Sequence, residues 1–451
     1  MMNKSQAKLI SYNVENLEIC ASAARISTTR GNAVEIFEKA KGNEKNQELV
    51  KKVLYSGHKS IIEHVVFTIA LKDVSAFVEQ FFIECRLASF TVKSRRYVDF
   101  SRLGYYIPSD LEGDNLNQYC QYMDNLFSAY KTMLDNGIPK EDARFLLPYS
   151  FNSNFYCTIN ARELLHIIYD IKYGRGQGIP ELQDLANQIV EQVEEVFPGI
   201  QSEIKAIPIE GKISKTPKNI IKINDSLSFI ESKEIGIVRL LNAPSDPSGI
   251  LDMAYGINHS DVDDLLDLGI LLKSERPREL EQLSYSFLIS NITLSGITHI
   301  VRHRMQSIIV PSIQGVEHSK FVIPDTIRND SRLLDIYKDI LETANNLMKQ
   351  MCRDEKLGQY SYYYALSGNV MDIITTINAR ELMHFIKLRA CNRAQWEIRN
   401  ISIEMLKHLR LSFPELFNYF GPSCFVSGIC PEGSMSCGEM DDVIRNFKNL
   451  K

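Results

Sequence analysis

The sequence predicts an α+β fold made of two tandem domains, each helix-rich with an antiparallel sheet. The main observation is that one pattern occurs twice in a single gapless register. The stretch "INARELLHII" begins at Ile159, and "INARELMHFI" begins at Ile377, 218 positions later. The same offset relates Arg86 to Arg304. A period this long indicates two fused domains rather than a solenoid of short repeats.

Within each repeat the predicted elements come in the same order. A β-leaning stretch, "VVFTIAL" or "YSFLISN", precedes a long apolar helix, and a second helix begins at the shared N-A-R-E-L motif. In the helix after it, both repeats space four apolar residues by 3, 4 and 4 positions. They are Leu182, Leu185, Ile189 and Val193, and then Ile398, Ile401, Met405 and Leu409. Such spacing predicts one buried stripe per helix, and the strands are too few for a doubly wound sheet.

These patterns divide the chain into four segments. We place the first domain at residues 1–212, a polar, lysine-rich linker at 213–232, the second domain at 233–420 and a cysteine-containing tail at 421–451. At 451 residues and 44% apolar composition, the chain can bury two ordinary cores.

Composition excludes several classes of protein. A net charge of −5 argues against a partner that is a long nucleic acid. No apolar run has the length of a signal peptide or a membrane span, so we expect a cytoplasmic protein with no membrane partner. Nine cysteines are an odd number, and disulfides are not expected. Cys424, Cys430 and Cys437 lack the tight spacing of a zinc ribbon, and we predict no metal site.

The triplet Arg302-His303-Arg304 is the most concentrated charge motif. It follows the mostly apolar stretch "ITLSGITHIV", which holds it against a core. Two arginines around a histidine suit a phosphate, a pyrophosphate or an electron-rich ring. The alternative is a solvated basic helix end, but the apolar residues before the triplet favour a ligand.

Each repeat has lost cations that the other keeps. The compact anion cradle of Ser94, Arg95 and Arg96 in the first repeat has no cationic counterpart in the second. The aligned pairs are Arg302 with Glu84, His303 with Cys85, Arg96 with Gln314, Arg144 with Tyr362 and Arg389 with Ile171. A pocket built from both repeats would keep all its charges, whereas its pseudo-symmetric mate would have none.

Two further motifs lie at predicted helix starts. In "GHKSIIEH", Ser60 and Glu63 fit a capping box, an interpretation at least as good as a ligand role on spacing alone. The order of its histidines does not match the two-histidine zinc motif. In N-A-R-E-L, Asn160 is a predicted N-cap, but capping does not explain why Arg162 and His166 recur in both repeats. An arginine beside free helix amides suits a phosphate-bearing ligand.

Together these motifs resemble those of the flavin-dependent thymidylate synthase family. That family carries R-H-R-x-x-S-x-N-E-x-S-x-R-Y, a G-H-x-[ST]-x-x-E-H stretch before it, and N-A-R-E-L followed by L-R and A-Q-W-E-I-R. Here the second repeat reads "NARELMHFIK" and "LRACNRAQWEIR", and the first supplies "GHKSIIEHVVFT" and "GIPKEDARFLLP". The tail "GPSCFVSGICPEGSMSCG" is similar to that of longer members. The resemblance covers nearly the whole chain.

The resemblance implies a methyltransferase that converts deoxyuridine monophosphate (dUMP) to thymidine monophosphate, with FAD as cofactor and methylenetetrahydrofolate and NADPH as co-substrates. Substrate binding is implied for Ser94, Arg95, Arg96, Arg144, His299, Arg302 and Arg389. Arg389 is the implied catalytic residue, because it favours the N3-deprotonated uracil ring. Cofactor binding is implied for His58, Ser60, Glu63, Asn160, Arg162, His166, Arg302, His303, Arg304, Asn378, Arg380 and His384. One composite site per chain, and a homodimer that imitates the family's homotetramer, complete the expectation.

The chain departs from the family pattern in two places. The motif's Asn-Glu pair is Thr91-Val92 in one repeat and Ile309-Val310 in the other, and the glutamine before R-H-R is Phe81 or His299. Two alternatives therefore stay open. One is a diverged flavin-dependent enzyme acting on another pyrimidine nucleotide. The other is a non-catalytic homologue that binds a nucleotide or flavin, against which the retention of four arginines argues.

Overall fold

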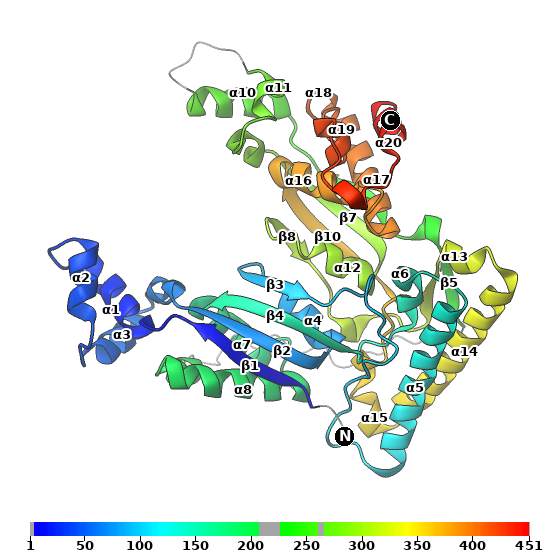
Figure 1. Cartoon of the computed structure of the whole chain (residues 1–451), viewed down its shortest axis with the longest axis horizontal. Helices are drawn as coiled ribbons and strands as arrows, with labels where there is room; N and C mark the ends of the chain where they lie inside the picture. Colours follow the sequence, from blue (N-terminus) through cyan, green and yellow to red (C-terminus); the bar gives the residue numbers. More distant parts are fainter. Residues whose placement is uncertain (1–3, 207–225, 260–265, 451) are drawn as a thin grey trace.

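Two four-stranded antiparallel sheets form the framework of the chain, one in each repeat (Figure 1). The computed structural model describes residues 4–206, 226–259 and 266–450. The strand order is β1-β2-β4-β3 in the first sheet and β6-β7-β10-β8 in the second. This confirms the predicted fold, in which each repeat is helix-rich and holds an antiparallel sheet.

The first repeat holds four strands, nine α-helices and two 3-10 helices among its described residues. Its strands are β1 (Gln6–Tyr12), β2 (Val66–Ser75), β3 (Ala88–Val92) and β4 (Asn152–Asn160). Its helical segments are α1 (Asn16–Ile26), α2 (Ala33–Ala40), α3 (Asn46–Tyr55), η1 (Lys59–His64), α4 (Ala76–Ile83), α5 (Gly113–Asp135), α6 (Lys140–Ala143), η2 (Arg144–Leu146), α7 (Ala161–Tyr173), α8 (Pro180–Val196) and α9 (Ile200–Ala206), where η denotes a 3-10 helix and the two η segments are counted separately.

The second repeat follows the same order with two added strands. Its strands are β5 (Ser228–Glu231), β6 (Ile237–Asn242), β7 (Ser284–Thr293), β8 (Gln306–Ile309), β9 (Lys320–Ile323) and β10 (Val370–Asn378). Its helical segments include α10 (Pro247–Asn258), α11 (Leu268–Leu271), η4 (Arg278–Gln282), α12 (Leu294–Ile300), α14 (Ser331–Arg353), η6 (Ser361–Tyr363), α16 (Ala379–Arg389), α17 (Trp396–Ser412) and α18 (Pro414–Phe417). The tail adds α19 (Ser423–Ser427) and α20 (Met440–Lys448).

Strands β2 and β7 share an unusual backbone feature at aligned positions. The strand register shifts next to Asp73 in β2 and next to Asn291 in β7. Both residues have positive φ angles, 51° and 56°, which Asp and Asn tolerate better than most other residues. The neighbouring strand accepts each backbone N–H, through Asn154 Oδ1 at 3.2 Å and Asp372 Oδ1 at 2.9 Å. The duplication thus extends to local backbone conformation.

The repeats meet about an approximate two-fold axis. Pro148 and Leu366 occupy aligned positions and form an antiparallel bridge with each other. The flanking backbone hydrogen bonds are reciprocal, at 2.7 Å from Tyr149 N–H to Ala365 O and at 2.9 Å from Ser367 N–H to Leu147 O. The long helices α5 and α14 lie side by side across the same junction (Figure 1). One chain is therefore a pseudo-dimer of its two repeats.

Two aligned arginines strengthen this junction. Arg86 donates from Nη1 to Gln306 O at 2.5 Å, and Arg304 donates from Nη1 to Ala88 O at 2.9 Å. The sequence predicted that Arg304 contacts a flavin, but in the chain itself this side chain reaches the backbone of the other repeat.

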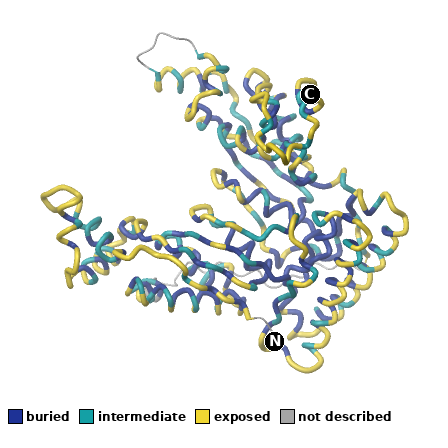
Figure 2. The backbone as a smooth tube through the Cα atoms, viewed as in Figure 1, coloured by how far each residue is buried: buried dark blue, intermediate teal, exposed yellow. Residues whose placement is uncertain are grey.

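Buried apolar side chains of both repeats form one continuous core. Burial is densest where the two halves of the molecule meet (Figure 2). The two separate cores expected from composition are therefore fused. The predicted stripes of α8 and α17 are confirmed, since all eight of their apolar residues are buried.

The prediction of a long apolar helix after the β-leaning stretch is wrong in both repeats. Helices α4 and α12 are short, and the long helices of each repeat are α5 and α14, which the sequence analysis did not identify. Most of the predicted linker lies outside the described residues, and its last part, residues 226–232, contains β5, which pairs in parallel with β9. All nine cysteines are free. Among the described helices, none is long and apolar enough to cross a membrane.

One predicted cap is confirmed and one is wrong. Asn160 Oδ1 accepts from Glu163 N–H at 2.9 Å, and its aligned partner Asn378 caps α16 at the same distance. Ser60 makes no capping bond, because "GHKSIIEH" forms the 3-10 helix η1, whose N-cap is His58. Glu63 is instead paired with Arg162 at the start of α7.

A buried glutamate fixes the junction between strand and helix in each repeat. Glu397 accepts from Thr293 N–H at 2.7 Å and from Thr293 Oγ1 at 2.6 Å. Glu181 accepts from Ser75 in the same way, at 2.8 and 2.6 Å. Thr293 and Ser75 are the N-caps of α12 and α4. Burial raises the pKa of Glu397 to about 7, against the effect of the Thr293 hydrogen bonds.

This raised pKa predicts how stability depends on pH. Because the folded pKa lies above the unfolded value, the folded state binds more protons, and this contribution to stability is lost as pH rises from about 5 to 8. Glu397→Gln removes the titrating group, so between these pH values its unfolding free energy should gain about 3 kcal/mol relative to wild type. Urea unfolding at both pH values measures the difference. The control is Glu415→Gln at an exposed position. An equal gain in unfolding free energy in both variants would contradict the assignment of the pH dependence to Glu397.

Candidate active site

Cationic side chains from both repeats converge around His299. Arg144 and Arg95 from the first repeat, and Arg302 and Arg389 from the second, all act electrostatically on the His299 ring. Arg96 joins them, since it acts on Arg389 together with Arg302. We call these five arginines and His299 the composite cluster. The structure thus brings together the arginines and the histidine that the sequence predicted for the substrate site.

The cluster is built from the ends of secondary-structure elements. Arg95 and Arg96 lie in the loop after β3, and Arg144 begins η2. His299 lies in the last turn of α12, with Arg302 just beyond its end, and Arg389 is the last residue of α16. Ends of this kind leave long side chains free to point away from the packed elements. Ser94, predicted to bind substrate, accepts a hydrogen bond at 3.3 Å from the backbone N–H of Arg96 and so shapes the loop.

Two hydrogen bonds between the repeats join residues that lie in or beside the cluster. Arg96 Nη2 donates to Arg393 O at 3.1 Å, and Trp396 Nε1 donates to Asp142 Oδ1 at 2.7 Å. Arg96 also pairs with Glu141 at 2.8 Å.

Several buried polar atoms of the cluster have no partner. Arg144 is 2% exposed and Arg95 is 5% exposed. Within the described residues, Arg144 Nη2, Arg95 Nη1 and His299 Nε2 are buried without a hydrogen bond. An unsatisfied buried donor costs about 1–3 kcal/mol, and more when it is charged. Their convergence therefore indicates a site for an anionic ligand with several acceptor oxygens.

The charge of the cluster is only partly neutralised. Arg95 pairs with the buried Glu79, but no carboxylate in the described part of the chain forms an ion pair with Arg144, Arg302 or Arg389. Burial lowers the pKa of Arg144 to about 10, and burial with the neighbouring Arg302 lowers that of Arg389 to about 10. Both remain protonated near neutral pH. Burial and the surrounding arginines lower the pKa of His299 well below its ordinary value, so its ring is neutral.

The aligned positions of the other repeat, the mirror positions, form no such cluster. Tyr362 stands in place of Arg144 and packs against Phe77 with ring centroids 4.8 Å apart. Glu84 stands in place of Arg302 and pairs with Arg175 at 2.6 Å. Ile171, in place of Arg389, is fully buried. Aromatic packing, an ion pair and apolar packing fill these three mirror positions, so the complementary losses seen in the sequence correspond to a cationic side and a closed side.

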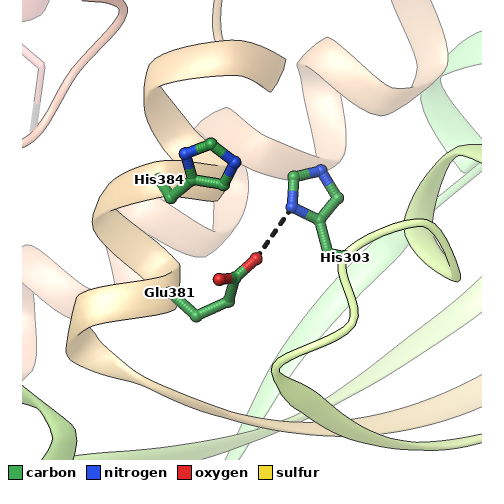
Figure 3. Close-up of side chains that lie close together, drawn as sticks. All are labelled: His303, Glu381 and His384. Carbon is green, nitrogen blue, oxygen red and sulfur yellow. Dashed lines mark hydrogen bonds and ion pairs between the residues drawn. The ribbon is translucent and has the colours of Figure 1, made fainter. Parts of the chain in front are cut away.

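His303, Glu381 and His384 lie close together beside the cluster (Figure 3). His303 Nδ1 is 3.0 Å from Glu381 Oε1, and His303 Nε2 accepts from Arg389 Nε at 2.9 Å. The spacing of the three side chains is that of a metal site. However, both ring nitrogens of His303 are already hydrogen-bonded, one of them to a cation, and we assign no metal.

The other residues predicted to bind a cofactor form two exposed groups. In the first repeat, the Glu63–Arg162 ion pair joins η1 to α7. His58, Ser60 and His166 are exposed around it, and Asn160 caps α7. In the second repeat, Glu281 and Arg380 form the aligned ion pair, with Asn378 capping α16 and His384 exposed. No hydrogen bond or ion pair among the described residues joins the first group to the composite cluster.

The sequence analysis missed the acidic and aromatic side chains that hold the cluster. Glu79 lies in the otherwise apolar stretch "AFVEQFFI", is fully buried, and accepts from Arg95 and Ser153. A single carboxylate inside an apolar helix was the available signal. Asp142 and Trp396 carried no such signal, because their contact joins the two repeats.

A cavity of about 250 Å³ adjoins the cluster. Arg96 from the first repeat and Arg389 from the second line it, together with Cys424, Cys430 and Glu432 of the tail. The tail therefore forms one wall of the space next to the composite cluster.

Comparisons with known proteins agree with the duplication. The family model described as "Thymidylate synthase complementing protein" matches residues 8–199 and again 251–415. The chain is similar to the flavin-dependent thymidylate synthase of Clostridium tetani, with 33% identity over 211 residues that cover 43% of this chain and 84% of that protein. The enzyme of the same name from Geobacter sulfurreducens is 30% identical over 45% of this chain and 88% of its own length. Among solved structures, a UMP/dUMP methylase from Streptomyces cacaoi bound with 5-Br dUMP is 22% identical, covering 46% of this chain and 98% of that one, with a TM-score of 0.38.

The single tryptophan of the chain reports on the cluster. Trp396 bonds Asp142, and its ring lies 6.3 Å from that of Phe145, next to Arg144. Inorganic pyrophosphate should change Trp396 fluorescence saturably. Arg144→Ala should raise the midpoint about 10–100-fold, as expected for the loss of a hydrogen bond from a charged group.

The control for this titration is Arg175→Ala, which removes an arginine from the closed side and should leave the midpoint unchanged. If the pyrophosphate titration of Arg144→Ala had the same midpoint as that of wild type, the anion would bind elsewhere.

Proposed function

The chain belongs to the thymidylate synthase complementing protein family, and from this membership we propose that it converts dUMP to thymidine monophosphate in a flavin-dependent reaction. The observation that carries the proposal is the composite cluster, in which buried polar atoms without partners converge from both repeats. They are the guanidinium nitrogens of Arg144 and Arg95 from the first repeat and His299 Nε2 from the second. We propose that each chain has one such active site, because the mirror positions are filled by packed side chains.

The cluster offers a distinct role for each part of a pyrimidine nucleotide. Arg144 and Arg95 are the most deeply buried cations and hold unpartnered donors, which suits the nucleotide phosphate. Arg389 comes from the second repeat and is tethered through Nε, with its Nη groups left for the uracil ring. A guanidinium there stabilises negative charge that develops on the ring, a preorganised electrostatic effect. The neutral ring of His299 offers Nε2 as one further hydrogen-bonding atom.

The exposed groups around η1 and α7 fit a flavin nucleotide. The donor set combines imidazoles, a hydroxyl and a guanidinium on the surface, in the side chains of His58, His166, Ser60 and Arg162. Such donors suit the phosphates and polar ring edges of FAD. The bound flavin would supply hydride transfer, with methylenetetrahydrofolate as one-carbon donor and NADPH as reductant. The role of the chain is to bind and orient these molecules and to keep the pyrimidine site cationic.

A second candidate is a related flavin-dependent enzyme that acts on another pyrimidine nucleotide. It is favoured by the loss of the family's motif glutamate. The two positions are Val92 in β3 and Val310 just after β8, and neither can supply a carboxylate. Removing a negative charge from the substrate region changes which ring substituents the site accepts.

We also propose that two chains associate into a dimer that imitates a tetramer of single-domain subunits. Large apolar side chains are exposed on strands of both sheets, including Tyr156 on β4, Ile374 on β10 and Ile309 on β8. Exposed apolar surface of this kind is typical of a protein–protein contact.

Titration calorimetry with dUMP should saturate at about one nucleotide per chain. Arg144→Ala and Arg389→Ala should each abolish the binding, because both remove a cation of the one proposed site although they belong to different repeats. UMP and dCMP titrated in parallel test the second candidate. Rescue of a thymidine-requiring strain by the wild-type gene then tests turnover.

The controls are the mirror variants Tyr362→Phe and Glu84→Gln, which should bind like wild type. Two equivalent sites per chain, or binding that survives both arginine substitutions, would refute the composite site.

Flavin binding should depend on the intact triplet of the second repeat. Purified wild-type protein should be yellow, and Arg302→Ala should lose the colour, because the family resemblance assigns Arg302 to the flavin as well as to the nucleotide. Glu84→Ala, at the aligned position, should stay yellow. Absorbance near the flavin maximum, relative to protein, measures both. If Arg302→Ala retained stoichiometric flavin, the assignment of Arg302 to the flavin site would be wrong.

A further inference from the structure

Arg389 is held through one atom. Its Nε donates to His303 Nε2 at 2.9 Å, and this is its one hydrogen bond among the residues that the structure describes. Both Nη groups are therefore left for a ligand, and Arg389 lines the cavity that adjoins the composite cluster. An arginine fixed at Nε has its guanidinium plane oriented while its terminal donors stay available.

This contact determines which nitrogen of His303 carries the proton. An arginine donates and does not accept, so His303 Nε2 must be unprotonated. The proton of the neutral ring then sits on Nδ1, which donates to Glu381 Oε1 at 3.0 Å (Figure 3). His303 is 4% exposed and packs edge-on against Phe385, so the ring cannot turn freely. Burial lowers the pKa of His303, which favours this neutral form.

The first repeat shows the same position without the arginine. Cys85 aligns with His303, and its Sγ donates to Glu163 Oε1 at 2.7 Å, as His303 does to Glu381. A thiol has no second nitrogen to accept from an arginine, and the position aligned with Arg389 is Ile171, which is fully buried. Both repeats therefore have the carboxylate. The second repeat has both the imidazole and the arginine that is bonded to it, and the first repeat has neither.

We infer that His303 and Glu381 are positioning residues that orient Arg389 towards the bound nucleotide, an inference that rests on the proposed function. Glu381 fixes the tautomer of His303, and His303 fixes Arg389 at Nε. Glu381 itself is set by the helix start, because its backbone N–H is bonded by Asn378 Oδ1. The N-A-R-E motif thus connects helix capping to the direction of a substrate-facing cation.

The test compares Glu381→Ala with the matched first-repeat variant Glu163→Ala in the full-length chain. The Kd for dUMP should rise about tenfold in Glu381→Ala, the effect expected when a partner that orients a ligand-binding group is lost. Glu381→Gln keeps an acceptor for His303 Nδ1–H and should restore affinity to within about twofold. Glu163→Ala should bind like wild type.

A second readout does not need the nucleotide. Modification of Arg389 by phenylglyoxal, followed by peptide mass spectrometry, should be faster in Glu381→Ala because the guanidinium is released from His303, and should be unchanged in Glu381→Gln and Glu163→Ala. Unchanged Kd and unchanged modification in Glu381→Ala would overturn the inference. If wild type fails to bind dUMP while Arg389 still becomes more reactive in Glu381→Ala, the orienting contact stands and the proposed substrate is wrong.

Discussion

Arg144 is a cation buried at the junction of the two repeats, and the arrangement of the site depends on how the buried charge is stabilised. Moving a charge out of water costs several kcal/mol unless other groups stabilise it. Its Nε donates to Glu141 O at 3.1 Å within the first repeat. The negative field of Glu397, from the second repeat, also favours its charged form. The carboxylate of Glu141, from the first repeat, adds to this field, so groups of both repeats stabilise the buried cation.

Glu397 connects this electrostatic role to the fold. It accepts hydrogen bonds from Thr293, the N-cap of α12, and α12 carries His299 in its last turn. The helix passes so close that a Cβ on Gly296 would lie 2.7 Å from Glu397 Oε1, which explains a glycine at this position. His299, which we propose to contact the nucleotide, is therefore placed by the same buried carboxylate that stabilises the strand-to-helix turn.

The asymmetry between the repeats follows from the same energetics. A buried arginine without an anion is costly, so a mirror site that no longer holds a ligand gains stability when uncharged side chains replace its cations. Tyr362 against Phe77, and Ile171 in the core, are such replacements. The junction itself has kept its symmetry, because Arg86 and Arg304 make reciprocal contacts that stabilise both repeats equally.

The sequence by itself determined the features that depend on near neighbours along the chain. The caps at Asn160 and Asn378 and the stripes of α8 and α17 depend on residues of the same helix, and they were predicted. The duplication was predicted because it is a direct comparison of the sequence with itself. The complementary loss of cations was also visible, because the two repeats serve as each other's alignment.

The tertiary structure decided what depends on distant partners. Ser60 was expected to cap a helix, but Glu63 is drawn to Arg162 across 99 positions. Trp396 meets Asp142 across 254 positions, and Arg304 reaches Ala88 across 216. No local pattern encodes such contacts, because they form only when distant segments of the chain pack together, within one repeat or between the two. Polar groups buried by this packing must then find partners.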